Sequence, residues 1–137
     1  MRGRLAGTKV AIIEDDALLS RSMALFLLVR GARVETYASA EEAGDAVTLG
    51  GFDLVISGYL LPGENGLSFL RRVREASATA GTVLIASRAG KDLPKEAADA
   101  GIDSFLSKPF STKDLEAALS RILERGGTGG EESSEAM

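Results

Sequence analysis

The chain contains neither cysteine nor histidine among its 137 residues. The absence of cysteine excludes a disulfide framework and thiolate chemistry. The absence of histidine excludes a histidine base and a histidine phosphocarrier, and it removes the commonest metal ligand in proteins. The candidates for chemistry are therefore carboxylate, hydroxyl and ammonium side chains.

Concentrated positive charge is absent as well. The formal net charge is −4 at pH 7, and three of these negative charges belong to Glu131, Glu132 and Glu135 near the C-terminus. The remainder of the chain is nearly neutral and carries no basic stripe. This charge distribution argues against nucleic acid as a partner.

Long hydrophobic runs are also lacking. The longest apolar run, MALFLLV at residues 23–29, is too short to cross a bilayer, and we expect it to form a buried helix face. The N-terminal MRGRLAG is basic but has no apolar segment like that of a signal peptide. These features favour a cytoplasmic domain that does not contact a membrane.

Short apolar runs alternate with helical patterns along the chain, of which 45% is hydrophobic. Strands are predicted at KVAIIE (9–14), RVETY (33–37), FDLVIS (52–57), TVLIAS (82–87) and DSFLSK (103–108), with RVETY the weakest. Helices are predicted over 17–30, from a Ser39–Glu42 capping box to about Gly50, over 67–76, over 94–100, and from a cap at Ser111 onward. The alternation predicts one α/β domain of the (βα)5 type, with a doubly wound, five-stranded parallel sheet.

The periodicity also predicts which residues of two helices face the core. In the first helix these are Leu19, Met23, Phe26 and Leu27, and in the last helix Leu115, Leu119, Ile122 and Leu123. The domain is predicted over residues 8–125. Residues 1–7 are expected to form a flexible arm, and GGTGGEESSEAM at 126–137 a flexible tail or linker, because it has no apolar period.

Polar residues and one glycine stand where the predicted strands end. They are Glu14, Asp15 and Asp16 after the first strand, Gly58 after the third, Ser87 after the fourth and Lys108 after the fifth. Each is weak by itself, since adjacent acids are often solvated turn residues, Asp16 suits a helix cap, and a single serine or lysine is usual on a surface. The carboxyl ends of parallel strands meet at one edge, however, and ligands bind there. The combination predicts a site with oxygen ligands for Mg²⁺ and donors for phosphate oxygens.

Four segments, AIIEDD, DLVISGYLLPGENG, TVLIAS and FLSKPF, follow one another in an order and at a spacing that resemble the receiver domain of bacterial two-component response regulators. The resemblance covers residues 8–125 and implies the flavodoxin-like receiver fold. For Mg²⁺, it implies that Glu14 and Asp15 form the acidic pair, with Asp15 the direct ligand and the carbonyl of Leu60 a further ligand.

The same resemblance implies roles around a phosphoryl group. The hydroxyl of Ser87 would close on it, and Lys108 would pair with its oxygens. The bond from Lys108 to Pro109 is expected to be cis, and Phe105 stands at the aromatic switch position.

The phosphoacceptor aspartate of the family falls on Gly58, four residues before Pro62. Glycine cannot form an acyl phosphate, and without an aspartate there we expect Mg²⁺ binding to be weak or absent. Ser57 should point to the opposite face of the sheet by strand alternation, and Glu64 lies beyond the turn. Arg88 is a second departure, since the family usually has a small residue there, and it could crowd the pocket.

Three functions are compatible with this pattern. The first is a receiver domain of a two-component phosphorelay in a phosphoacceptor-dead form, natural or engineered, and the near-complete pocket favours it. The second is a pseudo-receiver that docks to proteins without phosphorylation. The third, an enzyme of similar architecture, is disfavoured because no Asp-x-Asp follows a strand and no Ser/Thr/Gly-rich phosphate loop is present.

The resemblance also implies partners. A sensor histidine kinase or a phosphotransfer protein would dock to the domain. An output domain or protein would contact the surface made by the fourth helix, the fifth strand and the last helix.

Overall fold

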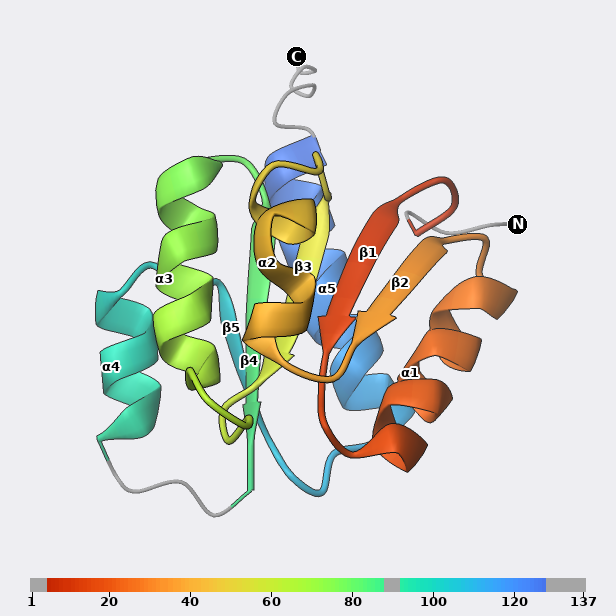
Figure 1. Ribbon diagram of the computed structural model, residues 1–137. Coiled ribbons are helices and arrows are strands. Elements are labelled where there is room, and N and C mark those ends of the chain that lie inside the picture. The colour runs from red at the N-terminus through yellow and green to blue at the C-terminus, as the bar shows by residue number, and fades with distance from the viewer. Residues whose placement is uncertain (1–4, 88–91, 128–137) are drawn as a thin grey trace.

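The computed structural model describes residues 5–87 and 92–127, and Figure 1 shows their arrangement. Its strands are β1 (Lys9–Ile13), β2 (Arg33–Tyr37), β3 (Leu54–Gly58), β4 (Gly81–Ala86) and β5 (Ser104–Ser107). Its helices are α1 (Ala17–Val29), α2 (Ala40–Thr48), α3 (Gly66–Ala76), α4 (Leu93–Asp99) and α5 (Thr112–Gly127). All strand pairs are parallel, in the order β2-β1-β3-β4-β5. The predicted doubly wound α/β fold is confirmed.

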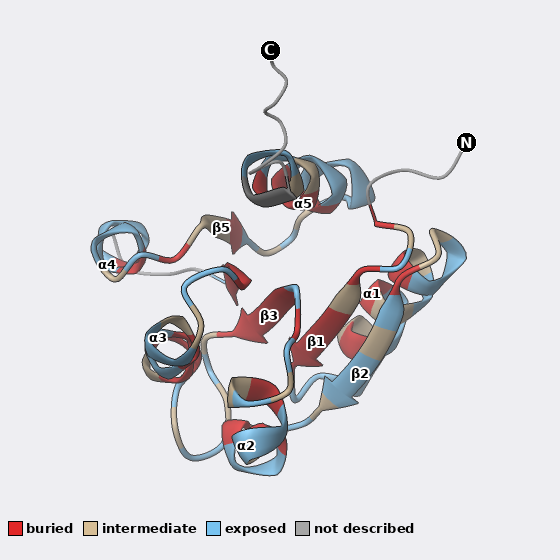
Figure 2. Cartoon of the chain, turned by 90° about the horizontal axis from the view of Figure 1, so that it is seen from above, coloured by how far each residue is buried: buried red, intermediate tan, exposed pale blue. Residues whose placement is uncertain are grey.

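Helices cover both faces of the sheet, as the view along it in Figure 2 shows. One core cluster joins alternate strand residues to α1 and α5, and the other joins the remaining strand residues to α2, α3 and α4. The three inner strands β1, β3 and β4 are buried almost throughout, which explains their continuous apolar runs. β2 is an exposed edge strand, and its weak sequence pattern follows from that position.

The predicted helix caps are present. Asp16 accepts hydrogen bonds from the backbone N–H groups of Leu18 and Leu19. Ser39 accepts from the N–H of Glu42 at 3.0 Å, and Glu42 accepts in return from the N–H of Ala38. At the start of α5, Ser111 accepts from the N–H of Asp114 at 3.1 Å. These bonds satisfy donors that a helix leaves open in its first turn, so they fix where each helix begins.

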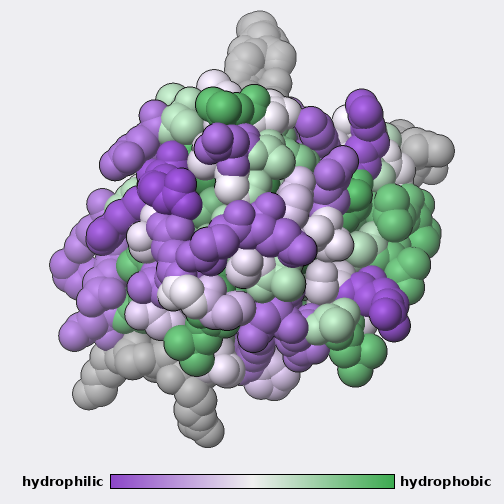
Figure 3. Space-filling view, in the orientation of Figure 1, coloured by the Kyte–Doolittle hydropathy of each residue, from purple (hydrophilic) through white to green (hydrophobic). Residues whose placement is uncertain are grey.

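The prediction for the run at 23–29 was wrong. Leu25 is 56% exposed, Leu28 50% and Val29 79%, and Figure 3 shows hydrophobic surface on the side of the molecule where α1 lies. Successive helix residues turn by about 100°, so seven consecutive apolar residues surround the helix. α1 rests on the sheet with one side only. Of the predicted inward face, Met23 and Leu27 are buried, whereas Leu19 and Phe26 are half-buried.

The last helix follows its prediction more closely, with Leu115, Leu119 and Ile122 buried and Leu123 half-buried. At the N-terminus, residues 5–7 belong to the folded body, which corrects the predicted flexible arm for these three residues. Leu5 is 5% exposed and belongs to the core cluster under α1 and α5. Residues 1–4 and 128–137 lie outside the described residues. Across the described ranges, none of the helices is long and apolar enough to cross a membrane.

Candidate functional site

The carboxyl edge of the sheet brings Glu14, Gly58 and Lys108 together from three different strands. Backbone hydrogen bonds to neighbouring strands hold each position. The N–H of Glu14 donates to the carbonyl of Tyr37 at 2.9 Å, and the N–H of Lys108 donates to that of Ala86 at 2.9 Å. Gly58 closes β3 and lies beside Ile85 of β4. The spacing of these three residues is therefore set by the sheet.

The carboxylate of Glu14 lies directly against the backbone of Gly58. A Cβ atom added to residue 58 would be 2.7 Å from Oε1 of Glu14. The side chain of Glu14 is only 2% exposed. The Glu14 carboxylate can therefore lie here only because residue 58 has no side chain.

Glu14 has two partners at the edge. Its Oε2 accepts a hydrogen bond from the N–H of Asp16 at 3.0 Å. Its Oε1 lies 3.7 Å from Nζ of Lys108 and has no hydrogen bond of its own. Burial raises the pKa of Glu14, and the N–H of Asp16 and the charge of Lys108 oppose that rise, while neighbouring Asp15 adds to it. The arrangement is a buried carboxylate with one ammonium group as its counter-ion.

The other predicted ligands lie at the surface. Asp15 and Ser87 are exposed, and so is Leu60, the residue whose carbonyl is the predicted ligand, at 75%. Arg88, the predicted obstruction, lies outside the described residues. Within residues 5–87 and 92–127, no group of three or more acidic side chains is arranged to hold a metal ion. The donor set for Mg²⁺ is two carboxylates, one exposed and one already facing Lys108, which is a poor fit to a cation that needs several oxygen ligands.

Both alternative nucleophiles already have hydrogen-bond partners. Ser57 is fully buried and pairs in register with Ile13 and Leu84, which belong to the core under α2, α3 and α4. Its Oγ donates to the carbonyl of Gly58 at 2.9 Å. Glu64 is held by Arg72, whose Nη2 lies 2.7 Å from Oε1, and this contact is the main cause of the lowered pKa of Glu64.

Phe105 lies in β5, and Pro109 lies shortly after the end of that strand. Phe105 is half-buried, lies beside Leu84 in the register of β4 and β5, and packs against the core under α2, α3 and α4. The peptide bond between Lys108 and Pro109 is cis.

Sequence reasoning missed the role of Gly66. A Cβ atom there would come 1.8 Å from the carbonyl oxygen of Gly58. The N–H of Gly66 donates to the carbonyl of Tyr59 at 2.8 Å. The signal was present in LPGENG, because a glycine directly before a helical pattern often marks a close backbone approach. Gly66 thus lets α3 begin against the end of β3.

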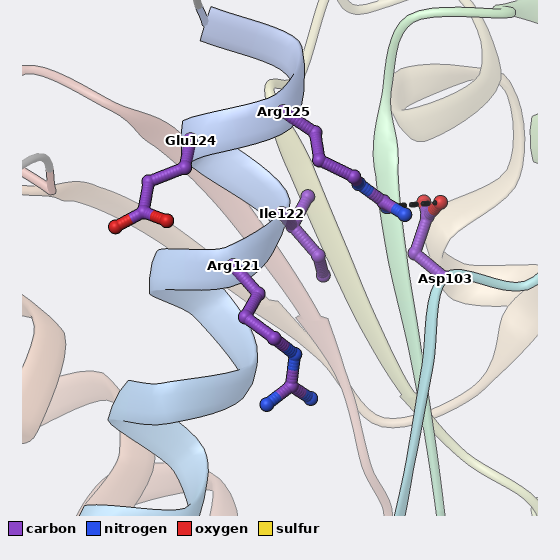
Figure 4. Close-up of a pocket in the computed structure, with 5 residues that line it drawn as sticks. All are labelled: Asp103, Arg121, Ile122, Glu124 and Arg125. Carbon is purple, nitrogen blue, oxygen red and sulfur yellow. Dashed lines mark hydrogen bonds and ion pairs between the residues drawn. The ribbon is translucent and has the colours of Figure 1, made fainter.

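A second cluster missed from the sequence lies around Asp103. A cavity of about 290 Å³ is lined by Asp103, Arg121, Ile122, Glu124 and Arg125. Figure 4 shows Arg125 reaching from α5 to Asp103, with Arg121 and Glu124 directed elsewhere. Asp103 precedes β5, so this cavity lies at the opposite edge of the sheet from Gly58. Its residues had no recognisable motif, since they come from distant parts of the chain.

A further cavity, of about 460 Å³, adjoins Glu14. Its lining comes from the start of α1, the end of β2 and the start of α2, and consists of Glu14, Asp15, Ala17, Ser20, Arg21, Ala24, Thr36, Tyr37, Ala38 and Glu42. This cavity opens the acidic side of the edge toward solvent, because Asp15 and Glu42 are exposed.

The doubly wound sheet carries an acid, a lysine and a strand-end glycine at its carboxyl edge, where the sequence placed them. A family model described as "Response regulator receiver domain" matches residues 10–120. The chain belongs to this family, which confirms the resemblance in AIIEDD and FLSKPF.

Curated relatives agree with the family. The chain is 31% identical over 123 residues to the transcriptional regulatory protein BasR of Escherichia coli, a match that covers 90% of this chain and 55% of BasR. It is 29% identical over 124 residues to the transcriptional regulatory protein TcrA of Mycobacterium tuberculosis, covering 90% of this chain and 49% of TcrA. The chain thus spans about half the length of these relatives.

Solved structures agree with the fold. The CheY-like receiver domain protein from Methanospirillum hungatei JF-1 superposes with a TM-score of 0.85 over 91% of this chain and 100% of that one. At 22% identity this likeness speaks for the fold alone. The chemotaxis response regulator CheY4 of Vibrio cholerae superposes with a TM-score of 0.78 at 25% identity, over 86% of this chain and 100% of that one.

Proposed function

We propose that this receiver domain is a phosphoacceptor-dead member of a two-component system, with Gly58 at the acceptor position. The observation that carries the proposal is the place of Gly58, at the end of β3 between Glu14 and Lys108. An acyl phosphate forms when a carboxylate oxygen attacks phosphorus, and residue 58 offers none. Ser57 and Glu64 are poor substitutes, because one lies in the opposite core and the other is paired with Arg72.

The remaining site residues stand where the family places its phosphate-site groups. In Gly58→Asp, Lys108 would pair with the phosphoryl oxygens and Ser87 would donate its hydroxyl. Phe105 is the switch aromatic. Receiver domains in general bind Mg²⁺. In this chain we expect weak binding or none, because Glu14 and Asp15 supply two carboxylates where the family uses three. Glu14, Asp15 and the carbonyl of Leu60 would hold the metal, whose positive charge would offset that of the two carboxylates.

The partners proposed are those of the family. A sensor histidine kinase or phosphotransfer protein docks on the domain without completing transfer. An output domain or protein contacts the surface of α4, β5 and α5, where Phe105 packs between the surface and the core. The matches cover only 55% and 49% of the relatives named transcriptional regulatory proteins, which supports an output function elsewhere in such proteins. The domain itself acts by binding and carries out no catalysis.

Phosphoryl transfer gives the direct test. The domain is incubated with acetyl phosphate and MgCl₂, and its intact mass is measured. We expect no stable gain of a phosphoryl group, whereas the Gly58→Asp variant gains one. The Gly58→Asn variant, of nearly the same size but without a carboxylate, is the matched control and stays unlabelled. Labelling of the unaltered chain at the pocket would overturn the proposal.

A pseudo-receiver is the second candidate, and one observation favours it. Lys108, 3.7 Å from Glu14, already gives that carboxylate a counter-charge beside Gly58 without a phosphoryl group. If this is so, the rest of the pocket no longer supports phosphoryl transfer, and Gly58→Asp should gain no phosphoryl group under the same conditions. Labelling of that variant decides for the phosphoacceptor-dead receiver.

A further inference from the structure

The structure points to Glu14 as the group that has replaced the missing acceptor side chain. We infer that its carboxylate lies in the space that a side chain on residue 58 would need, and that Lys108 is its permanent counter-ion. The inference rests on the proposed function, since it assumes that position 58 is the acceptor position. It assigns Glu14 a role other than metal ligand.

The present place of the Glu14 carboxylate is incompatible with a side chain on residue 58. A Cβ atom on residue 58 would lie 2.7 Å from Oε1, 3.3 Å from Cδ and 3.6 Å from Oε2 of Glu14. The first distance is closer than real Cβ contacts come, so any residue except glycine must displace the carboxylate. The whole carboxylate, and not a single oxygen, therefore lies against the position that a Cβ atom of residue 58 would take.

The electrostatics select Lys108 as the partner. Glu14 is almost completely buried, and a buried carboxylate is costly unless a cation or hydrogen bonds compensate it. The N–H of Asp16 satisfies Oε2, so Oε1 is left to Lys108 at 3.7 Å. Glu14 follows β1 and Lys108 follows β5, and the order β2-β1-β3-β4-β5 places two strands between them. The pair spans the end of β3 because Gly58 has no side chain there.

The pair has a chemical consequence for divalent cations. The oxygen that a metal would use already faces an ammonium group, so Mg²⁺ must compete with Lys108 for Glu14. The same pair joins the end of β1 to the segment between β5 and α5. The absence of a side chain at position 58 and the Glu14–Lys108 contact therefore depend on each other.

A larger side chain at residue 58 tests whether it competes with the Glu14 carboxylate for the same space. In the unaltered background, Gly58→Ala should lower the folding equilibrium constant, measured by urea unfolding, because its Cβ displaces the Glu14 carboxylate. In a Glu14→Ala background the same change should raise that constant by about two- to fivefold, since alanine is favoured over glycine in a strand. A reversal of sign supports the inference. The same sign in both backgrounds overturns it.

A double-mutant cycle tests the pair. Lys108→Met retains the apolar stem of the lysine, and Glu14→Gln retains the shape of the glutamate. We expect Lys108→Met alone to leave a buried charge without compensation, and Glu14→Gln in the same chain to recover most of the loss. A coupling of about tenfold in the folding constant is expected, and strictly independent effects overturn the inference.

Mg²⁺ titration is a further test, and it can be made with Lys108→Ala if Lys108→Met folds poorly. MgCl₂ is titrated calorimetrically into the unaltered chain and into Lys108→Ala and Lys108→Met, whichever is folded. Removing the ammonium should strengthen Mg²⁺ binding several-fold, and equal affinities contradict the competition. These results are separable from phosphoryl labelling. Labelling of the unaltered chain overturns the proposed function, whereas absent coupling with no labelling overturns only the role of Glu14.

Discussion

Arg74 holds Asp103 through a contact of 2.6 Å between Nη2 and Oδ2, and this joins the end of α3 to the segment before β5. The same carboxylate accepts from the N–H of Thr82 at 2.9 Å and, through Oδ1, from Arg125 at 2.8 Å. One acid therefore ties α3, β4 and α5 together. Both Arg74 and Asp103 are largely shielded from solvent, with side chains 24% and 19% exposed.

Asp103→Ala should destabilise the domain by about 1–3 kcal/mol, because the N–H of Thr82 and the guanidinium of Arg74 lose their shared acceptor. Chemical unfolding in urea measures the change. Asp99→Ala is the control, since Asp99 pairs with Lys95 at 3.2 Å on an exposed helix surface, with side chains 67% and 77% exposed. Such a pair contributes about 0–1 kcal/mol. Equal effects of the two substitutions would show that Asp103 is an ordinary surface acid.

The exposed face of α1 gives a second prediction. Leu25→Gln should change the unfolding free energy by about 0.5 kcal/mol or less, because Leu25 is already more than half exposed. Leu27→Ala, two residues further along, should cost about 2–5 kcal/mol, because Leu27 is fully buried. Thermal or urea melts of the two variants provide the comparison. A large loss for Leu25→Gln would place that residue in a core or an interface between copies.

Glu64 and Arg72 give a pH-dependent prediction. The pKa of Glu64 is lowered in the folded chain, chiefly by its hydrogen bonds with Arg72. A carboxyl whose folded pKa lies below its unfolded value stabilises the fold above the unfolded value, about 4.3 for glutamate, and loses that contribution as pH falls through the folded value. Arg72→Met should therefore reduce stability at pH 7 and should have little effect below the folded pKa. Melts from pH 7 to pH 2 test this, and a constant difference across that range would rule out the pair as its source.

The fold could be predicted from sequence because its determinants are local. Apolar runs such as TVLIAS, the Ser39–Glu42 capping box and the cap at Ser111 each act within a few residues, and the order of elements then leaves few topologies. The exposure of Leu25 and Val29 could not be predicted, because it depends on how α1 rests on the sheet. A run of apolar residues specifies a helix but not which side of it stays uncovered.

The site could be predicted in part for the same reason. The strand ends placed Glu14, Gly58 and Lys108 at one edge, and the structure brings them together. Sequence reasoning could not foresee that Glu14 covers Gly58, because this depends on a side-chain conformation and on a distance between two strands. The Asp103 cluster was also out of reach, since Arg74, Thr82 and Arg125 meet there only through the tertiary fold.

The last prediction concerns the stability of Gly58→Asp. The aspartate must displace the Glu14 carboxylate, whose Oε1 would be 2.7 Å from the new Cβ. It also adds a third carboxylate beside Glu14 and Asp15, and two like charges about 4 Å apart repel by up to roughly 4 kcal/mol at an effective dielectric near 20. Relief of the strand glycine returns only about 0.5–1 kcal/mol, so repulsion should win.

We therefore expect the unaltered chain to be at least as stable as Gly58→Asp in EDTA, by thermal melting of both proteins. MgCl₂ should narrow or reverse the difference, because three carboxylates bind the cation better than two. At ten times its dissociation constant a ligand adds about 1.4 kcal/mol to the state that binds it, enough to show in a melt of a domain of this size. Gly58→Asn separates charge from size, since it must also displace Glu14 but adds no carboxylate, and it should gain less from MgCl₂ than Gly58→Asp. Two results would contradict this picture, in which the edge lacks one carboxylate and Glu14 takes the space at residue 58. One is a higher melting temperature of Gly58→Asp than of the unaltered chain in EDTA. The other is an equal gain in melting temperature from Mg²⁺ in the unaltered chain.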